Sequence, residues 1–253
     1  MRSYKFIWGL ATVLLLLSGS GAFAQEENDA YNPNSVYPIS KHDQLYNKRI
    51  WRRMDLREKI NQPFFSKNKE ITKFLMDRVK DGSLVPYYSD SLDAEMSQVD
   101  FQKRITQKGT ENEFYPDEFT VLEIVEDLIF DKKRSRQYFD VQVIGMWQLA
   151  SVVDDPELRP YDTPIAYFRY KDLEKLFRDN PEDAMWYNRN NAAGHLNFAD
   201  AILLRLFHAR ITKVDNPDNL EIEDIAPNPQ QALFASQEAE YKLMEMEHDL
   251  WEY

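Results

Sequence analysis

The sequence predicts an α+β fold: one compact domain with a central, mainly antiparallel sheet flanked by helices, and an acidic helix at the C-terminus. Two observations predict this arrangement. The middle of the chain is rich in β-branched and aromatic residues that partly alternate with polar ones. The segments on either side carry apolar residues at helical spacing. With 253 residues, of which 43% are hydrophobic, the chain can form a core by burial alone.

The first 24 residues have the layout of a secretory signal peptide. Arg2 and Lys5 precede an apolar run, Phe6–Leu17, and residues 22–24 read Ala-Phe-Ala. The run is too short to cross ~30 Å of hydrocarbon comfortably, so we expect cleavage after residue 24 and export. The chain has no cysteine, which excludes a lipid-modified N-terminus, disulfides, thiolate metal sites and cysteine nucleophiles.

We expect four segments along the chain. Residues 1–24 are the signal peptide, 25–39 a polar, flexible lead-in, 40–226 the globular α+β domain and 227–253 a C-terminal amphipathic acidic helix. In that last helix small and apolar residues step by four and three: Ala232, Ser236, Ala239, Leu243, Met246 and Leu250. The series is short and weak for a coiled coil, so we expect ordinary docking onto a neighbouring surface.

Three strands and three more helices are predicted between these ends. The strands are 119–130, 138–153 and 163–170, and the first two form a hairpin across the polar loop DKKRSRQ. The helices are 69–80, ended by Asp81-Gly82, then 171–177, and 197–214 with Asn197 as its cap.

No pattern points to catalysis, a cofactor or a metal. The glycines are too scattered for a phosphate cradle, and the four histidines share no i, i+4 spacing. His195 is the best lone catalytic candidate, but a single histidine near a helix start is more often a structural residue. The net charge of −12 argues against nucleic-acid binding. The acidic residues gather after Asp215, where a solvated face and a partner-binding face remain open alternatives.

A basic stretch at residues 46–65 stands out in this acidic chain. We predict a helix from Ser40, which pairs with Asp43 in a capping box, to just before Pro63. On that helix three arginines form one stripe between apolar flanks: Arg49, Arg53 and Arg57. The solvent-facing side would hold Lys48, Arg52, Asp55 and Lys59. The alternative is a strand, because Ile50, Met54, Leu56 and Ile60 all fall on even positions, although twenty residues is long for one strand.

An arginine stripe within an apolar arc requires carboxylate partners, because an unpaired buried charge costs several kcal/mol. These partners come either from the same fold or from another subunit, since arginine and aromatic residues are enriched as interface anchors. We hypothesise a subunit interface. Its candidate residues are Arg49, Arg53, Arg57, Trp51, Asp55 and Glu58.

The stretch "YPISKHDQLYNKRIWRRMDLREKINQPFF", residues 37–65, resembles the signature of the GldN/PorN family. The residues that carry the resemblance are Trp51-Arg52-Arg53, Asp55-Leu56-Arg57-Glu58-Lys59, Asn61 and Pro63. The resemblance covers most of the mature chain in layout, but only this stretch is distinctive. The family has no catalytic residues to carry over.

The resemblance implies a non-enzymatic structural subunit of a periplasmic ring in the type IX secretion and gliding machinery of Bacteroidetes. The implied partners are a GldK/PorK-type outer-membrane lipoprotein, the GldM/PorM-type periplasmic part of an inner-membrane motor, and further copies of this chain. No cofactor, nucleic acid or direct membrane insertion is implied, and the location would be the periplasm, next to the outer membrane. The alternatives are a periplasmic binding or adhesion module without ring assembly and, third, a hydrolase, which would need a concave polar pocket.

Overall fold

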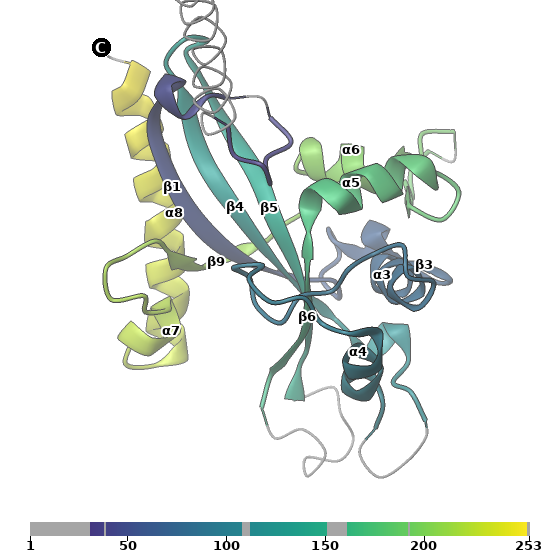
Figure 1. Cartoon of the computed structure of the whole chain (residues 1–253). Coiled ribbons are helices and arrows are strands. Elements are labelled where there is room, and N and C mark those ends of the chain that lie inside the picture. Colours follow the sequence, from purple (N-terminus) through teal and green to yellow (C-terminus); the bar gives the residue numbers. More distant parts are fainter. Residues whose placement is uncertain (1–30, 38, 108–111, 151–160, 192, 252–253) are drawn as a thin grey trace, which may run out of the picture.

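A twisted five-stranded antiparallel sheet forms the centre of the computed structural model, in the order β6-β5-β4-β1-β9 (Figure 1). The structure describes residues 31–37, 39–107, 112–150, 161–191 and 193–251, so the predicted signal peptide lies outside the described residues. The strands are β1 Gln44–Asp55, β4 Val121–Asp131, β5 Arg136–Gln148, β6 Thr163–Arg169 and β9 Arg210–Val214. The predicted α+β class is confirmed.

Two groups of helices lie to the right and to the left of the twisted strands in the view of Figure 1. The right-hand group is α3 Ile71–Lys80, α4 Gln98–Ile105, α5 Tyr170–Asp179 and α6 Phe198–Leu203; the left-hand group is α7 Ile222–Ile225 and α8 Pro229–Trp251. The short elements are η1 Lys41–Asp43, η2 Gln62–Phe64, η3 Pro116–Glu118, and the two-residue strands β2 Phe65–Ser66, β3 Lys69–Glu70, β7 Met185–Trp186 and β8 Leu196–Asn197.

The main core lies between one face of the sheet and helices α3 to α6. Cross-strand neighbours such as Met54, Leu122 and Met146 share this face, and Phe177 of α5 packs in the same cluster. A smaller cluster further along the same face holds Ile50, Leu128 and Ile211 of the sheet together with Leu243 of α8. We call this the helix-covered face. One continuous strand, β1, therefore contributes to both clusters.

The predicted helix from Ser40 to Pro63 is wrong, because this segment forms strand β1. The capping signal at Ser40 is real, but it caps only η1, where the Ser40 hydroxyl accepts a hydrogen bond from the His42 amide at 3.3 Å. The following residues pair with β4 on one side and β9 on the other. These long-range hydrogen bonds override the local helix propensity of Arg, Lys and Leu.

The helix predicted over 197–214 is right at its start and wrong at its end. The Asn197 side chain caps α6 by accepting from the Ala199 amide, but the helix ends at Leu203. Arg205 then takes a positive φ of 53°, and the chain turns into β9. The β-branched residues Ile211, Thr212 and Val214 favour that strand.

The other predicted elements are confirmed within the described residues: strands β4, β5 and β6, the β4–β5 hairpin, and helices α3, α5 and α8. Residues 151–153, included in the second predicted strand, lie outside the described residues.

Part of the predicted lead-in packs on the domain. Tyr31 and Ser40 form a β-bridge, and the Asn32 side chain donates to Gln142 of β5 at 3.0 Å. Ile39 is buried, and the rings of Tyr37 and Tyr138 lie 5.2 Å apart. The described residues of this segment therefore have partners on the end of the β4–β5 hairpin.

Helix α8 docks along β9, as predicted, through the small and apolar residues of the stepping series. Ala232, Ser236 and Leu243 are buried, and Ala239 and Met246 pack against the cluster that Leu243 forms with the sheet. The Leu250 side chain is outside the described set. The Ser236 hydroxyl donates to the Ile211 carbonyl at 2.7 Å. Among the described helices none is long and apolar enough to cross a membrane.

Candidate interaction face

The odd-numbered residues of β1 share one face of the sheet, opposite the helix-covered face. Side chains alternate along a strand, so Arg49, Trp51, Arg53 and Asp55 point to the same side. Their neighbours on the other strands include Glu123 and Asp127 of β4, Trp147 of β5, Tyr167 of β6 and Lys213 of β9. We call this surface the tryptophan face.

Arg49 and Asp127 form a two-pronged pair at one end of the tryptophan face. The two residues lie directly opposite each other on β1 and β4. The guanidinium donates from Nε to Oδ1 at 2.7 Å and from Nη2 to Oδ2 at 3.0 Å, and the hydrogen bonds to Asp127 raise the pKa of Arg49. Asp127 is almost fully buried, while 42% of the Arg49 side chain is exposed.

Trp51 lies at the centre of this face between a carboxylate and a cation. Its indole Nε1 donates to Oδ2 of Asp90 at 2.7 Å, and Lys213 Nζ lies 4.3 Å from its ring centroid. Asp90 belongs to the segment between α3 and α4, whose Leu92 also packs here. The indole is half-buried and held in place from two sides.

Arg53 covers a buried carboxylate. Its guanidinium lies 4.5 Å from the ring of Trp147, and Trp147 Nε1 in turn donates to Glu123 Oε2 at 3.3 Å. Glu123 is only 4% exposed and also hydrogen-bonds with Tyr167. Burial raises the pKa of Glu123 to about 7, although the nearby Arg53 cation acts in the opposite direction.

Gly145 makes this cluster sterically possible. It lies between Glu123 and Tyr167 in the sheet register. A Cβ at this position would be 2.8 Å from the Tyr167 ring, closer than real Cβ atoms approach. The absent side chain lets the tyrosine lie across β5 and reach the carboxylate.

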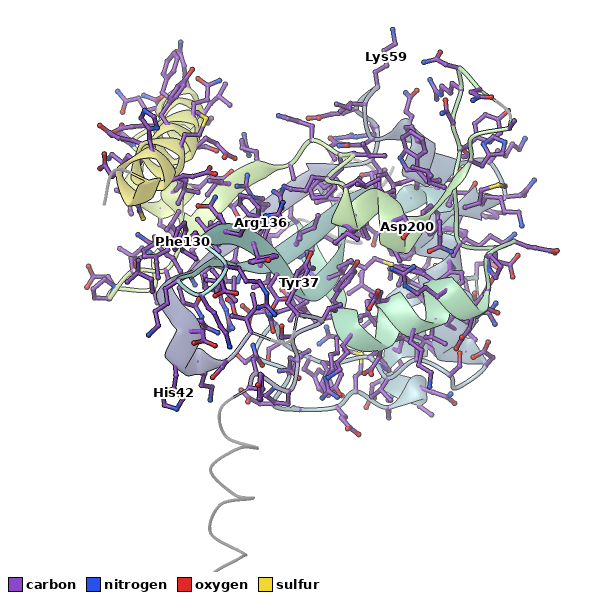
Figure 2. The ribbon with its side chains drawn as sticks, turned by 90° about the horizontal axis from the view of Figure 1, so that it is seen from above. Tyr37, His42, Lys59, Phe130, Arg136 and Asp200 are labelled. Atoms are coloured by element: carbon purple, nitrogen blue, oxygen red, sulfur yellow. The ribbon has the colours of Figure 1, made fainter. Side chains whose placement is uncertain are left out.

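The turn after β1 is held together by Asn61. Its amide donates to the carbonyls of Asp55 and His208, both at 2.8 Å, and its oxygen accepts from the His208 amide at 2.8 Å. Arg57 pairs with Asp55 at 2.6 Å, and Glu58 meets His208 Nδ1 at 2.8 Å. Lys59 extends away from the domain in Figure 2. The turn therefore presents charged side chains on a rigid base.

Among the described arginines Arg52 is the most buried, although the helical pattern predicted it on the solvent side. That prediction is wrong because Arg52 points into the helix-covered face, where it is 5% exposed. Its Nε donates to Glu126 at 2.6 Å, and its Nη atoms pair with Glu240 of α8. Arg205 binds the same Glu126 at 2.6 Å. The alternation of Ile50, Arg52 and Met54 was the signal that could have found this cluster.

The predicted interface residues are thus brought together in part. Arg49, Trp51, Arg53 and Asp55 share the tryptophan face, whereas Arg57 and Glu58 lie in the adjoining turn. The carboxylates that the arginines require come from the same chain, and Arg53 meets Glu221 at 3.8 Å. The carboxylate partners could come from the same fold or from another subunit, and the described residues show the first of these.

His195 has a local structural partner. Its Nδ1 accepts from the Asn188 amide at 3.1 Å, and its ring stacks on Tyr187 with centroids 4.6 Å apart. In the part of the chain that the structure describes, no group of three or more potential metal ligands comes together.

A model of the family described as gliding motility associated protein GldN matches residues 39–252. The chain belongs to the GldN family. The match runs from Ile39, two residues before η1, through β1 and the sheet, to the residue after α8. The chain is therefore a member of a family of gliding-motility and type IX secretion components, which is not a family of enzymes. A search of curated proteins gave no match.

The family assignment gives the distinctive stretch of residues 51–63 a structural explanation. Leu56 and Pro63 are buried, Asn61 joins the turn to the loop before β9, and Arg52 joins β1 to α8. These GldN-like residues therefore support the fold, while Arg57, Glu58 and Lys59 remain exposed.

Proposed function

We propose that this GldN-family chain is a non-enzymatic structural subunit of a periplasmic ring in the type IX secretion and gliding machinery. A GldK/PorK-type lipoprotein holds it at the outer membrane, and a GldM/PorM-type motor protein contacts it from the inner-membrane side. The observation that carries the proposal is the family match over residues 39–252.

The tryptophan face and its adjoining turn are the proposed contact for the lipoprotein. Arg49, Trp51 and Arg57 are already held by Asp127, Asp90 and Asp55. Such side chains lose little conformational freedom on binding, which favours affinity. Half-exposed arginine and tryptophan are also the residue types that anchor protein interfaces.

The residue to test is Arg57. Reversing the charge at Arg53 is unsuitable as a test, because it would place a second carboxylate opposite Glu123 and disturb the fold itself. Arg57 is half exposed, and its side chain bonds to Asp55. We expect Arg57→Glu to reduce co-purification of the lipoprotein about tenfold or more, with the melting temperature nearly unchanged.

Lys175→Glu on α5 is the matched control, because it makes the same charge change at an exposed site on another element. It should leave co-purification intact. Full lipoprotein recovery with Arg57→Glu would rule out the turn as part of the contact. Recovery of the wild-type chain as a small soluble species, free of the lipoprotein, would instead support the binding-module alternative.

A further inference from the structure

Helix α8 carries a second apolar stripe that the domain does not use. Its buried stripe faces β9, but four large apolar residues on the helix are exposed: Leu233, Phe234, Tyr241 and Met244, at 41%, 57%, 67% and 55%. At 100° per residue they fall within one arc of about 100°, opposite the buried series. Gln237 and His248 share that arc, so its apolar character comes from the four large side chains. Large apolar side chains gathered on one exposed face mark a site of contact with another protein. We call these four residues the outer stripe.

Carboxylates border the outer stripe. Glu238, Glu245 and Asp249 follow one edge of the arc, where the helix wheel places them next to Phe234 and Tyr241. Glu238 pairs with Lys242 at 2.7 Å. A surface that complements this one should be apolar at its centre and basic at its rim.

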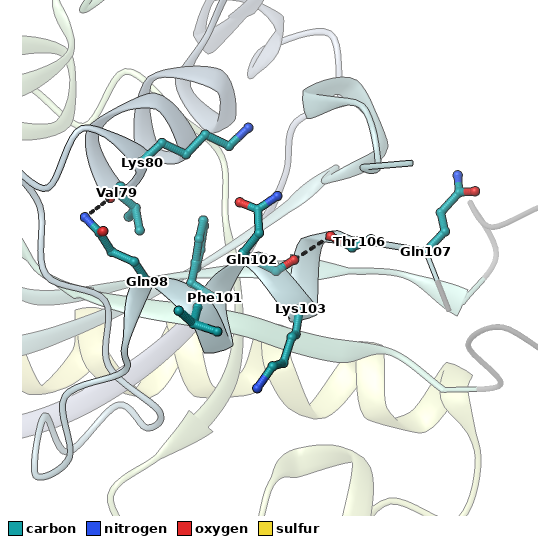
Figure 3. A pocket seen from close by; sticks show the side chains of 9 residues that line it. Val79, Lys80, Gln98, Phe101, Gln102, Lys103, Thr106 and Gln107 are labelled. Carbon is teal, nitrogen blue, oxygen red and sulfur yellow. Dashed lines mark hydrogen bonds between the residues drawn. The ribbon is translucent and has the colours of Figure 1, made fainter. Parts of the chain in front are cut away.

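The same chain has such a surface between α3 and α4. A groove of about 650 Å³ is lined by the apolar Val79, Val99 and Phe101, with Lys80 and Lys103 beside them. Figure 3 shows the two lysines on opposite sides of Phe101. The other described lining residues are Gln98, Gln102, Thr106 and Gln107, so no carboxylate lines the groove among them.

The groove is suited to large side chains. Phe101 is buried and forms its floor, whereas Val99 is 64% exposed at its edge. Lys103 meets Asp100 at 3.0 Å and Lys80 meets Glu113 at 2.6 Å, so each lysine can add a second carboxylate to an existing pair. Its volume is that of pockets that enclose most of a small ligand, which is room for two aromatic rings.

The outer stripe and the groove lie at opposite edges of the sheet, because α8 packs on β9 and α4 packs on β6 (Figure 1). One copy therefore cannot place its own α8 in its own groove. A contact that uses two different surfaces is heterologous: it leaves one free stripe and one free groove, and repeats from copy to copy.

We propose that the outer stripe of α8 docks into the α3–α4 groove of a second copy of this chain. This inference rests on the proposed function, because it supplies the copy-to-copy contact of the ring. Phe234 or Tyr241 fills the groove over Phe101, and Glu245 and Asp249 lie next to the neighbour's Lys80 and Lys103.

Complementation between two blocked variants tests this contact with purified mature chain alone. Tyr241→Glu places a charge in the stripe, and Val99→Glu places one in the groove. Sedimentation velocity should show concentration-dependent association for the wild type, and each variant alone should bind itself at least about tenfold more weakly. Lys175→Glu, the exposed control on α5, should associate like the wild type.

Mixing the two variants shows whether the outer stripe binds the groove. Each retains the surface that the other has lost, so together they should form a heterodimer that stops at two chains. A wild-type chain that stays monomeric, a single variant that still self-associates, or a mixture that stays monomeric would overturn the proposal. Circular dichroism melts confirm that both exposed-site variants are folded.

The outcome is separable from that of the proposed function. No lipoprotein is present in the mixing experiment, so a failed heterodimer with intact lipoprotein co-purification removes only this contact. If the heterodimer forms but the wild-type chain does not co-purify with the lipoprotein, only the proposed lipoprotein contact is contradicted.

Discussion

At the residue scale, the arginines of β1 differ in what they do although they are close in sequence. The buried Arg52 joins the buried Glu126 to the partly exposed Glu240, whereas Arg57 meets Asp55 at the surface. A buried pair that loses one partner leaves an uncompensated charge, while an exposed pair is screened by water. Burial, not charge, therefore separates structural from accessible arginines here.

Arg52→Lys should accordingly destabilise the protein. One ammonium group cannot reproduce the planar fork that reaches both carboxylates. We expect a loss of about 2–4 kcal/mol in the free energy of unfolding, measured by urea titration. Arg57→Lys, the matched change at the exposed pair, should cost about 0–1 kcal/mol. Equal losses in the free energy of unfolding for the two variants would contradict the structural role of Arg52.

Glu123 should make stability depend on pH. Burial raises its pKa to about 7, so the folded state binds this proton more tightly than the unfolded state, whose carboxyl titrates near 4.5. Stability therefore falls as pH rises from about 4.5 to about 7 and then levels off. For a shift of this size the loss is on the order of 3 kcal/mol.

Glu123→Gln removes this titration while keeping an oxygen for Trp147. Urea unfolding at pH values between 5 and 8 should show a smaller fall in stability for the variant than for the wild type. Asp140, whose pKa burial raises to about 6, contributes in the same direction to both proteins and cancels in the comparison. Parallel curves would show that Glu123 is ionised in the folded protein throughout this range.

At the element scale, the sequence was sufficient where local pattern and tertiary role agree. Strands β4 to β6 and helices α3, α5 and α8 combine matching composition with clear turns or caps. β1 failed because its charged residues favour helix locally, whereas its pairing with β9, more than 150 residues later, is not visible in any window. The tryptophan face needs that pairing and could not be predicted.

Helix α8 illustrates the same limit from the other direction. The small and apolar residues at steps of four and three predicted one docking side of the helix. The outer stripe, which includes Phe234 and Tyr241, lies in the same segment. Helical period alone could not show which of the two stripes meets the sheet. The position of β9 decides it, through Ser236 and Leu243.

Removing α8 tests its contribution to the fold. A chain ending at Pro227 keeps the main core, to which α8 contributes no buried residue, but exposes Ile50 and Ile211 and deprives Arg52 of Glu240. We expect cooperative unfolding to persist with a loss of about 3–5 kcal/mol, measured by urea titration, and self-association to disappear. Non-cooperative unfolding would show that the helix belongs to the core.

At the scale of the whole molecule, the described chain divides its surfaces between the fold and its partners. The interior charge cluster around Arg52 and Glu126 joins the sheet to α8. Arg49 and part of Trp51 on the tryptophan face, the adjoining turn, the outer stripe and the α3–α4 groove remain accessible in one copy. Several separate accessible surfaces on one small domain suit a subunit that contacts several neighbours at once.

In the proposed function, this GldN-family chain is a structural subunit that a lipoprotein holds at the outer membrane. The decisive experiment is to fractionate cells that have or lack that lipoprotein and to measure the size of the detergent-extracted complex in each. We expect a large complex in the outer-membrane fraction, and release of this chain into the soluble fraction when the lipoprotein is absent. A chain that is soluble and small in both cells, or membrane-associated in both, would disprove the proposed role.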